Sequence, residues 1–242
     1  MADNNVTTTT ETTTTEAQPI KKDFWATYSK PIIYVGGAVI ILIAGYFGYK
    51  KFVVEPKEIK ANEAVFQAES LFDKMATTGF NKDSINIVLN GGTVDNANIT
   101  GLLKIISTYS GTKAANRANY MVGAAYLQNK EFDKAIKYLN DFSSNGAYQL
   151  DIKKNILLGH AYAELKKTDD ALSAYKKATT INDKDEALTA DALIIAAAYA
   201  QSLGKKEDAI SLYQKAKDNY PAFPAVQNGD VDKNLAVLGV TK

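Results

Sequence analysis

Hydrophobic and polar residues follow three different patterns along this 242-residue chain. Residues 1–22 are polar and threonine-rich, so they cannot offset the entropy of ordering, and we predict a disordered tail. Residues 23–55 contain an unbroken apolar run. From residue 56 onward, apolar positions recur at the spacing of amphipathic helices. The pattern therefore predicts an all-α protein whose first helix is far more apolar than the rest.

The apolar run extends from Ile32 to Tyr49, which is 18 residues without a charge. A helix of that length spans about 27 Å, close to the thickness of a bilayer's hydrocarbon core. Lysines and aromatic residues flank both ends, as at membrane interfaces. We therefore predict that residues 23–55 form a single transmembrane anchor with its flanks. The apolar side chains assigned to the span are Ile32, Ile33, Val39, Ile40, Ile41, Leu42, Ile43 and Phe47.

A cleaved signal peptide or a buried core helix would also contain an apolar run. About 30 residues precede this run and no clear cleavage site follows it, which disfavours a signal peptide. The run is apolar on every face, and the domain after it looks complete without it, which disfavours a core helix. Lysines on both sides of the span leave its orientation open.

The polar part of the chain repeats itself. Tyr126, Tyr162 and Tyr199 are 36 and 37 residues apart. Each tyrosine lies in a segment of helical periodicity, followed by a short polar turn and a second amphipathic segment. Small residues let the two helices of a pair approach closely, and pairs must stack to bury their apolar stripes. The residues predicted to pack the pairs are Gly123, Tyr126, Ala135, Gly159, Tyr162, Ala171, Tyr175, Tyr199, Ala209, Tyr213 and Pro221.

These residues resemble the tetratricopeptide repeat, and the second unit matches its pattern best. The three units cover residues 116–221. The third unit carries one extra residue, which we place in its interhelix turn at residues 201–208. Residues 56–115 are predicted to form one or more divergent leading repeats, with a loop at residues 90–98. Residues 222–242 are predicted to form a C-terminal cap.

The resemblance implies that the first helix of each pair lines a concave face that binds a protein partner. An alternative is that this face only packs against the upstream helices. Ile156 and His160 stand where the acid-binding version of the repeat needs Lys and Asn, so we do not expect recognition of an acidic chaperone tail. The predicted face consists of Arg117, Tyr120, Leu127, Gln128, Lys153, Ile156, His160, Glu164, Leu193 and Gln201.

Charge and composition argue against nucleic acid binding and catalysis. The chain has 28 basic and 27 acidic residues, so no basic face is predicted and nucleic acid is not an expected partner. It has no cysteine and a single histidine, His160, which excludes thiolate and two-histidine metal sites. Paired acidic residues fall at predicted helix starts, where they complement the helix dipole. No catalytic groups converge, so we predict neither an enzyme nor a bound cofactor or metal.

The layout of tail, span and repeats resembles the YfgM-like ancillary subunits of the bacterial SecYEG translocon. That resemblance implies a single-pass protein of the bacterial inner membrane with periplasmic repeats. It would act as an adaptor or chaperone-like subunit that binds translocon components or exported chains. The alternative is a structural or assembly scaffold in cell-envelope or division complexes, in which the weak small-residue motif of Ala44 and Gly48 joins two spans.

Overall fold

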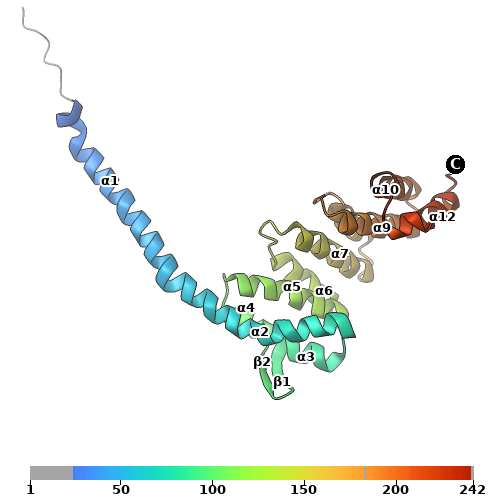
Figure 1. Ribbon diagram of the computed structural model, residues 1–242, viewed down its shortest axis with the longest axis horizontal. Helices are drawn as coiled ribbons and strands as arrows, with labels where there is room; N and C mark the ends of the chain where they lie inside the picture. Colours follow the sequence, from blue (N-terminus) through green and yellow to red (C-terminus); the bar gives the residue numbers. More distant parts are fainter. Residues whose placement is uncertain (1–23, 183, 241–242) are drawn as a thin grey trace, which may run out of the picture. The chain divides into compact units, whose positions relative to one another are not determined.

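The computed structural model describes residues 24–182 and 184–240 (Figure 1). The predicted fold class is confirmed: an apolar N-terminal helix precedes a series of helical repeats. The predicted tail at residues 1–22 lies outside the described residues. The chain divides into two compact units, of which the first reaches Lys51 and the second begins at Phe52.

In the first unit, α1 extends from Phe24 to Tyr49, and Lys30 is its only charged residue. Its apolar side chains are exposed, and those of Ile41 and Leu42 are each 72% exposed. Among the described residues, one helical segment is long and apolar enough to cross a membrane, and it contains this run. The backbone then follows a short π-helix, η1 (Lys50–Val54), before α2 begins.

The second unit opens with α2 (Glu55–Thr78), an amphipathic helix. Its buried side chains include Ala61, Val65, Ala68 and Phe72, which recur every three or four residues and so share one face. This face packs in the largest hydrophobic cluster of the protein, together with the helices that follow. Those helices are α3 (Lys82–Asn90), α4 (Leu102–Thr108) and α5 (Lys113–Gln128).

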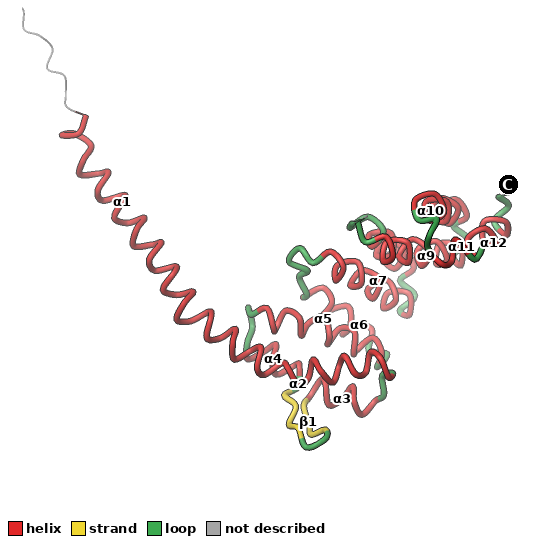
Figure 2. Tube along the Cα trace, viewed as in Figure 1, coloured by secondary structure: helices red, strands yellow, loops and turns green. Residues whose placement is uncertain are grey.

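The prediction of a loop over residues 90–98 is wrong, because a β-hairpin occupies this segment (Figure 2). Its antiparallel strands are β1 (Gly91–Val94) and β2 (Ala97–Thr100). Asp95 and Asn96 form the turn with φ of 50° and 63°. Two positive φ values match the two-residue turn that follows the twist of paired strands, and Asp and Asn tolerate them.

Three antiparallel helix pairs follow, and each packs on its sequence neighbours, as in a solenoid. A short helix α11 (Pro224–Gln227) and a final helix α12 (Asp230–Val237) end the described chain. Val231 and Leu235 of α12 are buried with residues of the third pair, so α12 covers the apolar end of the stack. The pairs are α5 with α6 (Phe132–Asp141), α7 (Tyr148–Glu164) with α8 (Thr168–Ala178), and α9 (Glu186–Ser202) with α10 (Lys206–Asn219).

Candidate protein-binding face

Two glycines set the distance between the helices of the first two pairs. A Cβ atom added to Gly123 of α5 would lie 2.6 Å from Cγ of Leu139 on α6. A Cβ atom added to Gly159 of α7 would overlap the ring of Tyr175 on α8. Contacts this short are not found between real Cβ atoms and their neighbours, so the close approach requires glycine at both places.

The turns inside the three pairs have the same geometry and give an objective register. Lys130, Lys166 and Gly204 adopt left-handed φ values of 61°, 60° and 69°. The amide that follows each of them donates a 2.9 Å hydrogen bond back to a carbonyl in the first helix. These carbonyls belong to Tyr126, Tyr162 and Ala200. Ala200, and not Tyr199, is therefore the equivalent of the two earlier tyrosines.

This register corrects the predicted third unit. Both α7 and its turn residue Lys166 are followed 38 residues later by α9 and Gly204, so the extra residues lie in the loop before α9. The prediction placed an extra residue in the interhelix turn at residues 201–208, which is wrong. Leu193 is consequently fully buried, and the assignment of Leu193 to the partner-binding face is wrong. The positions on that face are Asp191 and Ala198, both exposed.

The first unit's face is largely covered by α2. Nε of Arg117 donates to a carboxylate oxygen of Glu69 on α2 at 3.1 Å, and its Nη2 donates to Asn62 at 3.1 Å. Tyr120 is half-buried with its ring 5.4 Å from that of Phe142, and burial raises the pKa of its hydroxyl. Arg117 and Tyr120 thus contact the protein's own elements, which corrects their assignment to an open face.

Three more residues of the predicted face also differ from an open groove. Leu127 and Ile156 are 8% and 9% exposed and belong to hydrophobic clusters. Gln201 is half-buried and accepts a 3.1 Å hydrogen bond from the hydroxyl of Tyr213. The apolar side chains are buried because each first helix presents them to its neighbours in the stack, so the polar residues between them form the accessible surface.

The open part of the face is a cavity of about 470 Å³ at the ends of α5 and α7. Leu127 and Ala163 provide apolar surface, while Gln128, His160 and Glu164 are exposed and carry the hydrogen-bonding groups. We call this surface, together with Asp191 and Ala198 of α9, the inner face. Lys153, near the start of α7, is also exposed.

His160 is the chemically most distinctive group of the inner face. Its Nδ1 lies 2.8 Å from the hydroxyl of Tyr175, and the two rings meet edge to face. Burial raises the pKa of Tyr175, so its hydroxyl keeps the proton and can donate it to Nδ1. In that tautomer Nε2 carries a hydrogen and is a donor for a partner.

Partial burial keeps this histidine neutral at pH 7. Burial lowers the pKa of His160, and the carboxylates of Asp191 and Glu164 only partly oppose this effect. Burial raises the pKa of Asp191, and His160 acts in the opposite direction. The inner face therefore presents a neutral imidazole between two carboxylates, and it can accept and donate hydrogen bonds.

The matched family models coincide with the repeats seen in the structure. Residues 117–142 and 155–185 match one model of the tetratricopeptide repeat, and residues 192–222 match a second. This chain carries tetratricopeptide repeats. Repeats of this kind are protein-interaction modules, so protein partners are expected in general.

A curated relative supports the same conclusion over part of the chain. The TPR repeat-containing protein MJ0263 of Methanocaldococcus jannaschii is 33% identical over 98 residues. The match covers 39% of this chain and 30% of that protein, so the chain spans under a third of the relative's length.

Sequence reasoning missed Asp191 and Ala198. The signal for them was present, because the tetratricopeptide-repeat alanines Ala171 and Ala209 are 38 residues apart, and the same shift applied to α9 leads to both residues. The tyrosine at position 199 misled the alignment because it lies one residue before the equivalent position. In the structure Tyr199 instead packs edge to face on Tyr175, with ring centroids 5.1 Å apart.

Proposed function

We propose that this chain is a membrane-anchored adaptor whose tetratricopeptide repeats bind a protein partner through the inner face. The observation that carries the proposal is that α2 covers the face only at the first pair. From Gln128 to Ala198 the face is open, and it presents His160, Glu164 and Asp191 from two neighbouring helices. A rigid stack of pairs holds these groups at fixed spacing, which suits recognition of an extended surface.

We propose binding and not catalysis as the role of this face. Its polar groups are a neutral imidazole, two carboxylates and an amide, and the imidazole is engaged with the hydroxyl of Tyr175. Nothing in this set forms a nucleophile with its own base. The matched repeats support the same role, since they are interaction modules.

We further propose that α1 anchors the chain in the bacterial inner membrane, with the repeats in the periplasm beside the Sec translocon. The support is the apolar, exposed helix and the layout of anchor and repeats that resembles ancillary translocon subunits. Because the chain has no cysteine, a single cysteine at Asn228 reports its side of the membrane. We expect labelling by an impermeant maleimide once the outer membrane is opened, and labelling only after cell lysis would overturn the periplasmic placement.

Site-specific photo-crosslinking tests the inner face. A benzoylphenylalanine in place of Glu164 or Asp191 should capture partner proteins in membranes. The matched control replaces Lys177, an exposed residue of α8, and should capture none of the same products. Equal products from Lys177 would refute binding at the inner face. Products without any translocon subunit or exported chain would refute the translocon assignment alone.

A further inference from the structure

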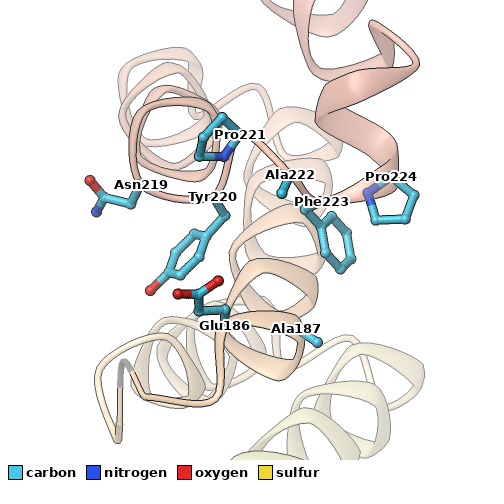
Figure 3. A pocket seen from close by; sticks show the side chains of 8 residues that line it. All are labelled: Glu186, Ala187, Asn219, Tyr220, Pro221, Ala222, Phe223 and Pro224. Carbon is cyan, nitrogen blue, oxygen red and sulfur yellow. The ribbon is translucent and has the colours of Figure 1, made fainter.

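A second cavity lies away from the inner face, at the other end of the third pair. It has a volume of about 650 Å³ and lies between the start of α9 and the segment that follows α10 (Figure 3). Its walls include Glu186 and Ala187 from α9, and Tyr220, Pro221, Phe223 and Pro224 from the segment after α10. None of the described residues lines both cavities.

The apolar wall of this cavity is held by the core. Tyr220 is buried in a cluster with Ala190, Leu193 and Ala216, and Phe223 packs against the same cluster. In Figure 3 the rings of Tyr220 and Phe223 both extend toward the first turn of α9. The wall is therefore in place before anything binds, and the volume falls within the range of known ligand sites.

One charge marks the edge of this apolar surface. Among the described residues that line the cavity, Glu186 is the only charged one. It is exposed, and no cation in residues 24–182 or 184–240 pairs with it. The neighbouring Asp185 is already used, because it caps Leu188 at 3.1 Å and accepts from Gln149 at 2.8 Å. A positive charge bound next to the apolar wall would find its counter-ion in Glu186.

We propose that this cavity binds an extended segment of a partner protein that places apolar side chains beside one lysine or arginine. Grooves lined by aromatic and proline rings take up extended, proline-containing segments because these lose little entropy on binding. Glu186 then selects the basic residue by charge complementarity. This site is separate from the inner face, so its existence does not depend on the proposed adaptor function.

Three fluorescein-labelled peptides test the proposal with the full chain in detergent micelles. The first is Gly-Leu-Pro-Lys-Leu-Pro-Gly, the second has Glu in place of Lys, and the third has Ser in place of both Leu. Fluorescence anisotropy, corrected for empty micelles, gives each Kd. We expect the lysine peptide to bind at least about tenfold more tightly than either of the others, which combines one charge contact with apolar burial.

Variants then locate the site. Glu186→Gln should weaken the lysine peptide roughly fivefold, Phe223→Ala about tenfold, and Glu186→Lys should reverse the preference in favour of the glutamate peptide. Glu207→Gln, an exposed carboxylate of α10 outside the cavity, is the control and should leave Kd unchanged. The reversal cannot come from misfolding. No binding of the lysine peptide at millimolar concentration, or the same Kd for Glu186→Lys and wild type with both peptides, would overturn the proposal.

Discussion

The first and second helix pairs share one repeat pattern but differ in what their faces can do. Both use a glycine in the first helix to admit a large side chain from the second, Gly123 with Leu139 and Gly159 with Tyr175. On the outside they differ, because α2 occupies the face of the first pair while the second remains open. The repeat pattern specifies the packing inside a pair, and the neighbouring elements decide whether its face is free to bind.

The largest expected effect concerns the two glycines. Gly159→Ala should cost about 2 kcal/mol of unfolding free energy, because overpacking outweighs the roughly 1 kcal/mol that alanine adds to helix propensity. Gly123→Ala should cost less, since the end of the Leu139 side chain can turn away whereas the ring of Tyr175 packs on Tyr199. Urea unfolding followed by circular dichroism measures both. A larger loss for Gly123→Ala would show that the two pairs do not differ in this way.

A second comparison uses Arg117 and Lys153, which hold the same position in the two pairs. Arg117→Ala should cost about 1 kcal/mol, because it breaks a half-exposed ion pair with Glu69 and a hydrogen bond to Asn62. It should also speed hydrogen exchange in α2. Lys153→Ala is the control, since this side chain is exposed, and should leave both measurements within error. Unchanged exchange in α2 after Arg117→Ala would mean that Arg117 does not hold α2 in place.

A smaller effect is expected from the hydroxyl that supports the inner face. Tyr175→Phe removes the 2.8 Å hydrogen bond to Nδ1 of His160 and should cost about 1 kcal/mol. It should also change the tautomer balance of His160, which the ¹⁵N chemical shifts of the ring report. Tyr213→Phe removes the hydrogen bond to Gln201 and is the matched control, with a similar loss of stability but no effect on the ring. An unchanged ring signal in Tyr175→Phe would contradict the geometry.

Much of this fold follows from periodicity. The apolar run and the recurring tyrosines and alanines predict one apolar helix and a series of helix pairs, and the structure has both. The hairpin at residues 91–100 escaped because its two glycines were taken for a loop, although the turn at Asp95 and Asn96 was the stronger signal.

The candidate site was less predictable because exposure depends on tertiary contacts. His160, Gln128 and Glu164 were predicted from the repeat pattern and are exposed. Nothing in the pattern around Arg117 indicates that α2 will bind it, since Asn62 and Glu69 lie 55 and 48 residues away in the sequence. The one-residue error in α9 shows a second limit, because a single shift exchanges a buried leucine for an exposed aspartate.

The smallest expected effect is a test of the open face itself. His160 is the only histidine, so its proton signal can be followed in the full chain without assignment. Its pKa should lie below the ordinary value of 6.5, because burial disfavours the charged ring. The folded state then binds this proton less readily than the unfolded state, so stability should fall as the pH drops from about 6.5 toward the folded pKa. Asp191→Asn should lower the pKa further, since a carboxylate that favours the charged ring is lost, whereas Asp218→Asn should not change it. A higher pKa in Asp191→Asn would mean that α9 does not present Asp191 to the inner face.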